Sequence, residues 1–267
     1  MVRSGPVRST LPNGRIFRLW TKGDDWISNE IFWKGWNGFE SDTSPLFYEL
    51  AAESKVIFDV GAHVGYYSIL AGLANPASRV YAFEPLPRAA HRFRKNLNEN
   101  KLDNVELIQC AVGASPGDAP FYCVPDESGG IPSSSGLSSL FFERPDFVKL
   151  GVSPRMKAQV ISLDDFVMER RIDRVDLVKI DTESTEPDVL RGMSAILKRD
   201  RPNLIFEVLP GLGADEKIDE ILRPLDYGYY LLTDKGAQER SRIKADQLHR
   251  NYLARSPGRA LPKILRP

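Results

Sequence analysis

Residues 56–65, which read VIFDVGAHVG, constrain the fold more than any other part of the chain. The apolar run that opens this segment is typical of a strand buried on both faces of a parallel sheet. Gly61 and Gly65 follow at once, and because glycine lacks a Cβ atom the backbone there can turn sharply and approach a ligand. The helix expected next would present free N–H groups to an anionic part of that ligand. The segment therefore predicts an open α/β sheet with a ligand at its carboxyl edge.

The rest of the chain repeats this alternation of buried strands and helices. After the first strand, apolar runs predict strands at residues 80–83, 105–108, 175–180, 204–208 and 229–232. Helical patterns lie between and after them, at residues 66–74, 87–100, 163–171, 186–198 and 214–225. Strands that alternate with helices imply a parallel sheet covered on both faces. We therefore predict an α/β fold with a doubly wound, mostly parallel, Rossmann-like sheet.

The N-terminal region, residues 1–50, departs from this alternation. Residues 7–11 and 15–20 predict a β-hairpin around Pro12-Asn13-Gly14, because Asn-Gly is a strong hairpin turn signal. All four tryptophans also lie in this region. Because aromatic side chains bury large areas when they pack, we expect an aromatic lid on the main domain, residues 51–267.

Two further segments lack the strand–helix pattern. Residues 114–158 are rich in Ser, Gly and Pro and predict a long irregular insertion. Within it, residues 128–140 are the candidate substrate lid, since they offer glycine hinges and hydroxyl groups. The tail that begins at Lys235 is basic, which is typical of a solvated face.

Composition excludes several classes of protein. Lys plus Arg and Asp plus Glu both total 36, so the net charge is zero. A broad nucleic-acid-binding surface is therefore not expected, because it normally shows as a basic excess. Only two cysteines occur, which argues against a disulfide framework and fits a reducing compartment. No apolar stretch is long enough for a membrane span or a signal peptide, so we expect a cytoplasmic protein that does not bind membranes.

Three consecutive strand ends carry a candidate cofactor signature. The first is the glycine turn, in which Asp59 suits the ammonium of an amino-acid ligand and His63 interrupts the three-glycine dinucleotide fingerprint. The second is Glu84, whose carboxylate can accept hydrogen bonds from both hydroxyls of a ribose. The third is the small pair Cys110-Ala111, which suits a flat base. A glycine turn, an acid and small residues at successive strand ends occur in sites for nicotinamide dinucleotides and in sites for S-adenosylmethionine. The interrupted fingerprint favours S-adenosylmethionine.

The motifs that carry these residues resemble those of the FkbM-type methyltransferases. The resemblance covers roughly residues 40–255 and rests on DVGAHVGYYS, AFEP, CAVG, KIDTESTEPDVLRGM and IFEV. It implies the class I methyltransferase sheet, S-adenosylmethionine as methyl donor, and a hydroxyl of a small molecule or sugar as acceptor. Two positions depart from the family pattern: His63 replaces the usual Asn of the glycine turn, and Ser184 replaces a glycine.

The strand ends and the resemblance together define the candidate site. The resemblance implies Asp59, Gly61, Gly65 and Glu84 as cofactor contacts, and Asp181 and Glu183 as active-site acids. The full set of candidate cofactor contacts is Asp59, Gly61, Ala62, His63, Gly65, Ser68, Glu84, Pro85, Cys110, Ala111 and Asp181.

Asp181, Glu183 and Glu207 follow adjacent predicted strands and are the candidate catalytic residues. Close carboxylates raise at least one pKa, which suits a general base for a hydroxyl acceptor. The same three oxygen donors would suit Mg²⁺, so a metal role stays open. Lys179 is expected to pair with a neighbouring acid, and Glu186 to support the N-terminus of the following helix.

Other functions are not excluded by these residues. A nicotinamide-dependent oxidoreductase and a catalytically inactive cofactor-binding protein are the alternatives. Nucleic-acid methylation is not expected, because the charge is neutral and no Asn-Pro-Pro-Tyr type motif occurs. The sequence leaves homo-oligomerisation and the identity of the small-molecule acceptor open.

Overall fold

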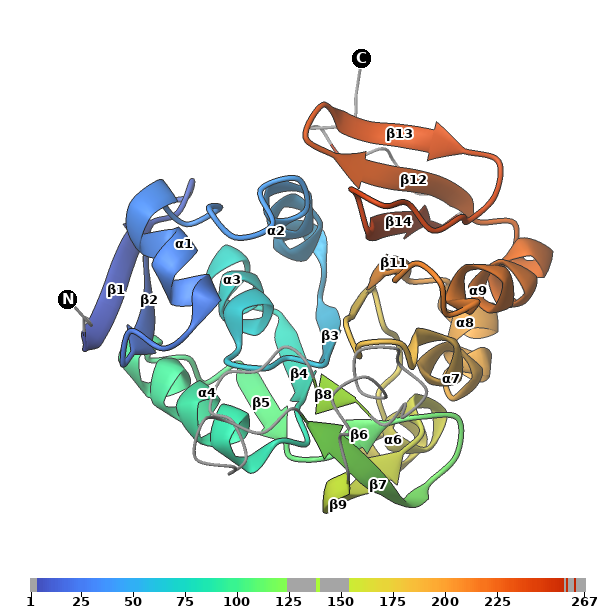
Figure 1. Cartoon of the computed structure of the whole chain (residues 1–267), viewed down its shortest axis with the longest axis horizontal. Helices are drawn as coiled ribbons and strands as arrows, with labels where there is room; N and C mark the ends of the chain where they lie inside the picture. The colour runs from blue at the N-terminus through green and yellow to red at the C-terminus, as the bar shows by residue number, and fades with distance from the viewer. Residues whose placement is uncertain (1–3, 124–137, 140–153, 257, 259–261, 263–267) are drawn as a thin grey trace.

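A central eight-stranded sheet forms the frame of the protein (Figure 1). The structure is a computed structural model and describes residues 4–123, 138–139, 154–256, 258 and 262. In spatial order the strands of the sheet are β13 (Gly236–Arg240), β12 (Gly228–Thr233), β14 (Asn251–Arg255), β11 (Asn203–Glu207), β10 (Leu177–Ile180), β3 (Val56–Val60), β4 (Arg79–Phe83) and β5 (Val105–Ile108).

Most strands of this sheet run in one direction. The neighbours β11, β10, β3, β4 and β5 are all paired in parallel. Strand β14 is antiparallel to both β11 and β12, so β12 keeps the common direction and only β14 and β13 are reversed. The prediction of a mostly parallel sheet is thus confirmed. The chain passes from β3 outward to β5 and later returns to β10 on the other side of β3, so a switch point lies between β3 and β10.

Helices cover both faces of the sheet, as a doubly wound fold requires. On one face lie α1 (Trp26–Lys34), α2 (Ser44–Glu53), α3 (Tyr66–Ala74) and α4 (Pro87–Asn100). On the other lie α6 (Leu163–Arg170), α7 (Glu186–Arg191), α8 (Ser194–Arg199) and α9 (Ala214–Leu222), the last followed by the 3-10 turn η1 (Arg223–Leu225). Ile57 packs into the first cluster and Phe58 into the second, because successive side chains of a strand point to opposite faces.

The predicted N-terminal hairpin is present. It consists of β1 (Gly5–Thr10) and β2 (Ile16–Thr21), which pair antiparallel. Two asparagines of α4 fix it to the main domain: the backbone N–H of Arg18 donates to Asn100, and that of Trp20 donates to Asn96. Helix α1 follows the hairpin, with Trp26 70% and Trp33 78% exposed. The division into a lid and a main domain stays a prediction.

A second, smaller sheet corrects the prediction for residues 114–158. It contains β6 (Ala111–Val112), β7 (Gly117–Cys123), β8 (Ser138–Ser139) and β9 (Pro154–Ile161) in the order β6-β9-β7-β8. Alternate residues of β7 and β9, among them Phe121 and Val160, are buried against the main domain. This two-residue alternation of apolar side chains was not recognised because turn-forming residues surround it. Most of the candidate lid 128–140 lies outside the described residues.

Two other expectations about elements were wrong. The helix expected over 186–198 is divided into α7 and α8 at Gly192, where a Cβ atom would lie 2.0 Å from the carbonyl oxygen of Gly113. The basic tail is not a solvated face throughout, because it forms β13 and the buried β14. Charges at its turns masked the apolar core of β14.

Within the described part of the chain, no helix is long and apolar enough to cross a membrane.

The contact between the glycine turn and the end of β10 generates a prediction about stability. Gly61 and Gly14 both have left-handed φ angles, 81° and 80°, but only at Gly61 would a Cβ atom collide, 1.8 Å from the carbonyl oxygen of Asp181. Gly14→Ala should lower the free energy of unfolding by about 1 kcal/mol, the cost of the left-handed backbone. Gly61→Ala should lower it by about 3 kcal/mol or more, because strain and a backbone clash add. Equal losses in urea unfolding would contradict this account.

Candidate active site

A cavity of about 320 Å³ opens at the carboxyl ends of β3, β4, β5, β10 and β11. Most of the predicted site residues line it. They are Asp59, Gly61, Ala62, His63, Glu84, Pro85, Cys110, Ala111, Asp181, Glu183 and Glu207. Gly65 and Ser68, which were also expected to contact the cofactor, are not among the described residues that line the cavity. The fold therefore brings residues from five strand ends to one place, next to the switch point.

The glycine turn is shaped by close backbone contacts. The N–H groups of Gly61 and Ala62 both donate to the carbonyl oxygen of Phe83, 3.0 Å away, which ties the turn to the end of β4. Gly65 has a φ of 88° and precedes α3, and a Cβ atom there would lie 2.1 Å from the ring of Phe93. Gly65 thus lets α4 pack against the turn, and its role is in the shape of the turn.

Glu84 is a buried carboxylate held by backbone donors. Its side chain accepts hydrogen bonds from the N–H groups of His63 at 2.8 Å and Leu86 at 2.7 Å. Burial raises the pKa of Glu84 to about 7, although these two hydrogen bonds oppose the shift. Each carboxylate oxygen accepts one backbone bond and keeps lone-pair capacity for a ligand. The arrangement orients Glu84 toward the cavity at the position expected for a ribose-binding acid.

His63 is neutral at pH 7, because burial lowers its pKa to about 4. Its side chain is half-buried, and the Nε2 atom has no hydrogen-bond partner among the described residues. Its backbone is left-handed, with a φ of 50°, a region in which Asn and His are enriched. The same backbone conformation suits Asn, the residue that the resemblance implies here, so His63 can take its place.

Asp59 and Lys179 stand side by side on neighbouring strands. They are register partners of β3 and β10, so both point to the same face of the sheet. Ser68 donates to Asp59 at 2.5 Å, and burial raises the pKa of Asp59 to about 6. Ser68 therefore orients Asp59 from the first turns of α3.

Lys179 is a fully buried cation. Its Nζ atom lies 3.2 Å from Asp181 and 5.0 Å from the centroid of the Tyr67 ring, which confirms the expected ion pair. Burial opposes the charge, but Asp181, Glu40, Asp59 and Glu207 outweigh it and raise the pKa of Lys179 above its usual value. Lys179 thus stays charged beneath the carboxylates of the cavity.

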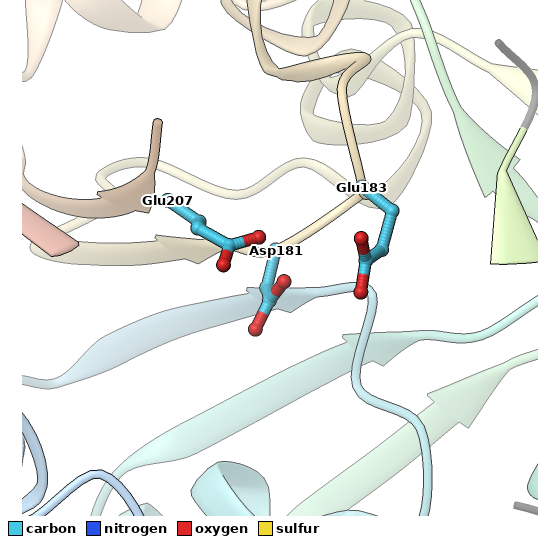
Figure 2. Close-up of side chains that lie close together, drawn as sticks. All are labelled: Asp181, Glu183 and Glu207. Atoms are coloured by element: carbon cyan, nitrogen blue, oxygen red, sulfur yellow. The ribbon is translucent and has the colours of Figure 1, made fainter. Parts of the chain in front are cut away.

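The three candidate catalytic acids meet at the ends of β10 and β11. Their carboxylate oxygens lie within 4.8 Å of one another, and Figure 2 shows the side chains converging. Burial, followed by the charges of Asp181 and Glu183, raises the pKa of Glu207 to about 9. The Arg250 guanidinium lies 3.7 Å from Glu207. Glu207 therefore holds its proton more tightly than a solvated glutamate does.

Glu186 organises the loop that carries two of these acids. Its carboxylate accepts hydrogen bonds from the backbone N–H and the hydroxyl of Thr182, both at 2.9 Å, and from the N–H of Ser184. Glu186 is the first residue of α7, and it is buried. Glu186 thus places a negative charge at the N-terminus of this helix, as expected. It also fixes the loop around Glu183 through the same hydrogen bonds.

Several residues that line the cavity were not predicted as site residues. Trp26, Ile27, Phe39 and Glu40 come from the N-terminal region, and Tyr67 comes from α3. Glu40 accepts a hydrogen bond from Tyr67 at 2.5 Å. Nothing in the sequence around Glu40 marks it, because no strand end or glycine turn precedes it. Its proximity to the carboxyl edge depends on how the N-terminal region packs.

The doubly wound sheet and the cavity at its switch point place the protein among the Rossmann-like α/β proteins. A family model described as the methyltransferase FkbM domain matches residues 59–231. Because this match covers more than half of the chain, the protein belongs to the FkbM methyltransferase family. The match favours the methyltransferase interpretation over the nicotinamide-dependent alternative.

Characterised relatives share moderate similarity with the chain. The 31-O-demethyl-FK506 methyltransferase FkbM of Streptomyces tacrolimicus is 30% identical over 154 residues, 52% of this chain and 59% of that protein. The hexuronic acid methyltransferase AglP of Haloferax volcanii is 27% identical over 159 residues, 60% of this chain and 58% of that protein. The matched segments thus span less than two thirds of the length of either relative.

A solved structure supports the fold. The crystal structure of methyltransferase FkbM from Methylobacillus flagellatus has a TM-score of 0.51 to this chain and 16% sequence identity. The superposition covers 76% of this chain and 44% of that one. At this level of identity the likeness concerns the fold alone.

The raised pKa of Glu207 predicts how stability depends on pH. Because the folded-state pKa of about 9 lies above the ordinary value of 4.5, the proton is bound more tightly in the folded protein. The contribution of this tighter proton binding to the free energy of unfolding is fully present below pH 4.5 and is lost as pH rises toward 9. The melting temperature of Glu207→Gln should therefore fall less than that of the unmodified protein between pH 5 and 9.

Glu220→Gln provides the control for this comparison, because Glu220 is exposed on α9. Glu84 and Asp59 also have raised pKa values, so some decline should persist in every variant. Parallel curves for Glu207→Gln and Glu220→Gln would contradict the assignment.

Proposed function

We propose that the protein transfers a methyl group from S-adenosylmethionine to a hydroxyl of a small molecule, either a sugar or a natural product. The observation that carries this proposal is a single cavity lined by the glycine turn, the buried carboxylate Glu84 and the converging acids. Two relatives whose names specify O-methylation or a hexuronic acid acceptor support the acceptor class.

The cavity offers complementary groups for each part of the methyl donor. Glu84 would accept hydrogen bonds from the ribose hydroxyls, as charge-assisted bonds. Cys110 and Ala111 would border the adenine, since small side chains leave room for a flat ring. The amino-acid end would lie at the turn near Gly61, where the N-terminus of α3 favours a carboxylate. The sulfur would then face Asp181.

The acids beside that position suit transfer to a hydroxyl group. The bound donor supplies an activated methyl, whose bond to sulfur breaks as its bond to the acceptor oxygen forms. Glu207 would take the acceptor's proton, because a carboxylate with a raised pKa is a stronger base once ionised. Asp181, paired with Lys179, would hold the acceptor in line with the methyl group.

A divalent cation at the same acids is a second way to hold the acceptor. The fit is chemical: Asp181, Glu183 and Glu207 present three hard oxygen ligands within 4.8 Å of one another. A cation there would bind a hydroxyl acceptor as a Lewis acid.

Binding measurements test the cofactor. Calorimetric titration should show saturable binding of S-adenosylhomocysteine and none of NAD. Glu84→Gln should weaken that binding tenfold or more, because charge-assisted hydrogen bonds contribute about 1.5–3 kcal/mol. Glu220→Gln should bind as the unmodified protein does. Binding of NAD, or no binding of S-adenosylhomocysteine, would refute the methyl donor.

Label transfer tests the acceptor and the base. With methyl-labelled S-adenosylmethionine and a fractionated native extract, the label should enter a fraction of low molecular mass. On that fraction, Glu207→Gln should slow transfer by about 10²- to 10⁴-fold and remove the loss of rate as pH falls through 9. Activity that survives EDTA supports the base, whereas activity restored by Mg²⁺ supports the cation. Label confined to protein or nucleic acid would refute the small-molecule acceptor.

A further inference from the structure

Glu40 lies in the N-terminal region, before α2 and outside the segment that the family model matches, yet it lines the same cavity as the glycine turn. Its backbone is left-handed, with a φ of 44°. Such a conformation is strained for a non-glycine residue and persists where the surroundings impose it. Here the N–H groups of Thr43 and Ser44 both donate to the carbonyl oxygen of Glu40 and hold the turn.

The carboxylate of Glu40 is fixed through one of its two oxygens. Oε2 accepts a hydrogen bond from the hydroxyl of Tyr67 at 2.5 Å and another from the amide of Asn251 at 3.2 Å. The donors belong to α3 and β14, which are far apart in sequence. Among the described residues, Oε1 has no hydrogen-bond partner. The side chain is therefore held in place with one acceptor oxygen left for a ligand.

The charges around Glu40 favour a cationic ligand group. Burial raises the pKa of Glu40, and Lys179 opposes that shift. Lys179 faces four carboxylates at once, those of Glu40, Asp59, Asp181 and Glu207. Acids thus outnumber this buried cation, so a second positive charge at Glu40 and Asp59 would lower the electrostatic cost of the cluster.

The position of Glu40 identifies which cationic group it would meet. Tyr67, which holds it, belongs to the first turn of α3, where the α-carboxylate of the donor is expected under the proposed function. The ammonium is attached to the adjacent carbon of the same amino acid and carries three N–H donors. A carboxylate bonded to this turn and lining the same cavity, with one free acceptor oxygen, therefore suits an ammonium group at this end of the donor.

We propose that Glu40 binds the α-ammonium group of the methyl donor through Oε1, so that the N-terminal region completes the amino-acid end of the cofactor site. The proposal rests on the proposed function, because it presumes S-adenosylmethionine in this cavity. It assigns a ligand-binding role to a residue that lies outside the matched family segment.

The test uses two ligands that differ only beyond the sulfur. S-Adenosylhomocysteine has the amino-acid end, whereas 5′-methylthioadenosine has the same adenine and ribose without it. In calorimetric titrations, Glu40→Gln should weaken S-adenosylhomocysteine at least tenfold and change methylthioadenosine by less than twofold. Glu84→Gln should weaken both ligands, because it alters the ribose contact.

Two controls separate binding from folding. Gln has the size of Glu, and its carbonyl oxygen can accept the bonds from Tyr67 and Asn251, so the melting temperature should not fall. Asp42→Asn neutralises a half-buried carboxylate of the same turn and should leave both affinities unchanged.

Equal weakening of both ligands by Glu40→Gln would indicate a structural role and overturn the proposal, as would unchanged affinity for S-adenosylhomocysteine. If the unmodified protein binds neither ligand, the proposed function itself fails, and the role of Glu40 fails with it.

Discussion

The site depends on one close approach, between the backbone of Gly61 and the carbonyl group of Asp181. A Cβ atom at Gly61 would lie 1.8 Å from that oxygen, so only glycine lets the turn after β3 touch the chain that leaves β10. This contact spans the switch point of the sheet and sets the glycine turn beside the acids. Without it, the groups expected to bind the donor and those expected to act on the acceptor would not share a cavity.

The second feature of the site is that several of its ionisable side chains are buried. Burial raises the pKa values of Asp59, Glu84 and Glu207, so each carboxylate is less stable as an anion here than in water. Lys179 offsets part of this cost from beneath the sheet edge. A fold selected for stability alone would place apolar side chains at these positions, whereas a site that binds a cationic donor benefits from them. The cluster is thus best understood as an element of function.

Residues at strand ends could be predicted from the sequence, and residues brought in by tertiary packing could not. The apolar runs and the turn around Gly61 located the parallel strands, and the fold then placed Glu84, Asp181 and Glu207 at one edge. Strands β7, β9 and β14 escaped prediction because polar and turn residues hide their short apolar patterns. Glu40 escaped because its place in the cavity depends on bonds to Tyr67 and Asn251, which lie 27 and 211 residues away.

We propose above all that this cavity binds the methyl donor with its sulfur toward the converging acids. A crystal structure with S-adenosylhomocysteine tests it most directly. We expect the ribose hydroxyls on Glu84, the adenine beside Cys110 and Ala111, the amino-acid end at Gly61, and the sulfur facing Asp181. Density for the ligand elsewhere, or in this cavity with its two ends reversed, would contradict the account.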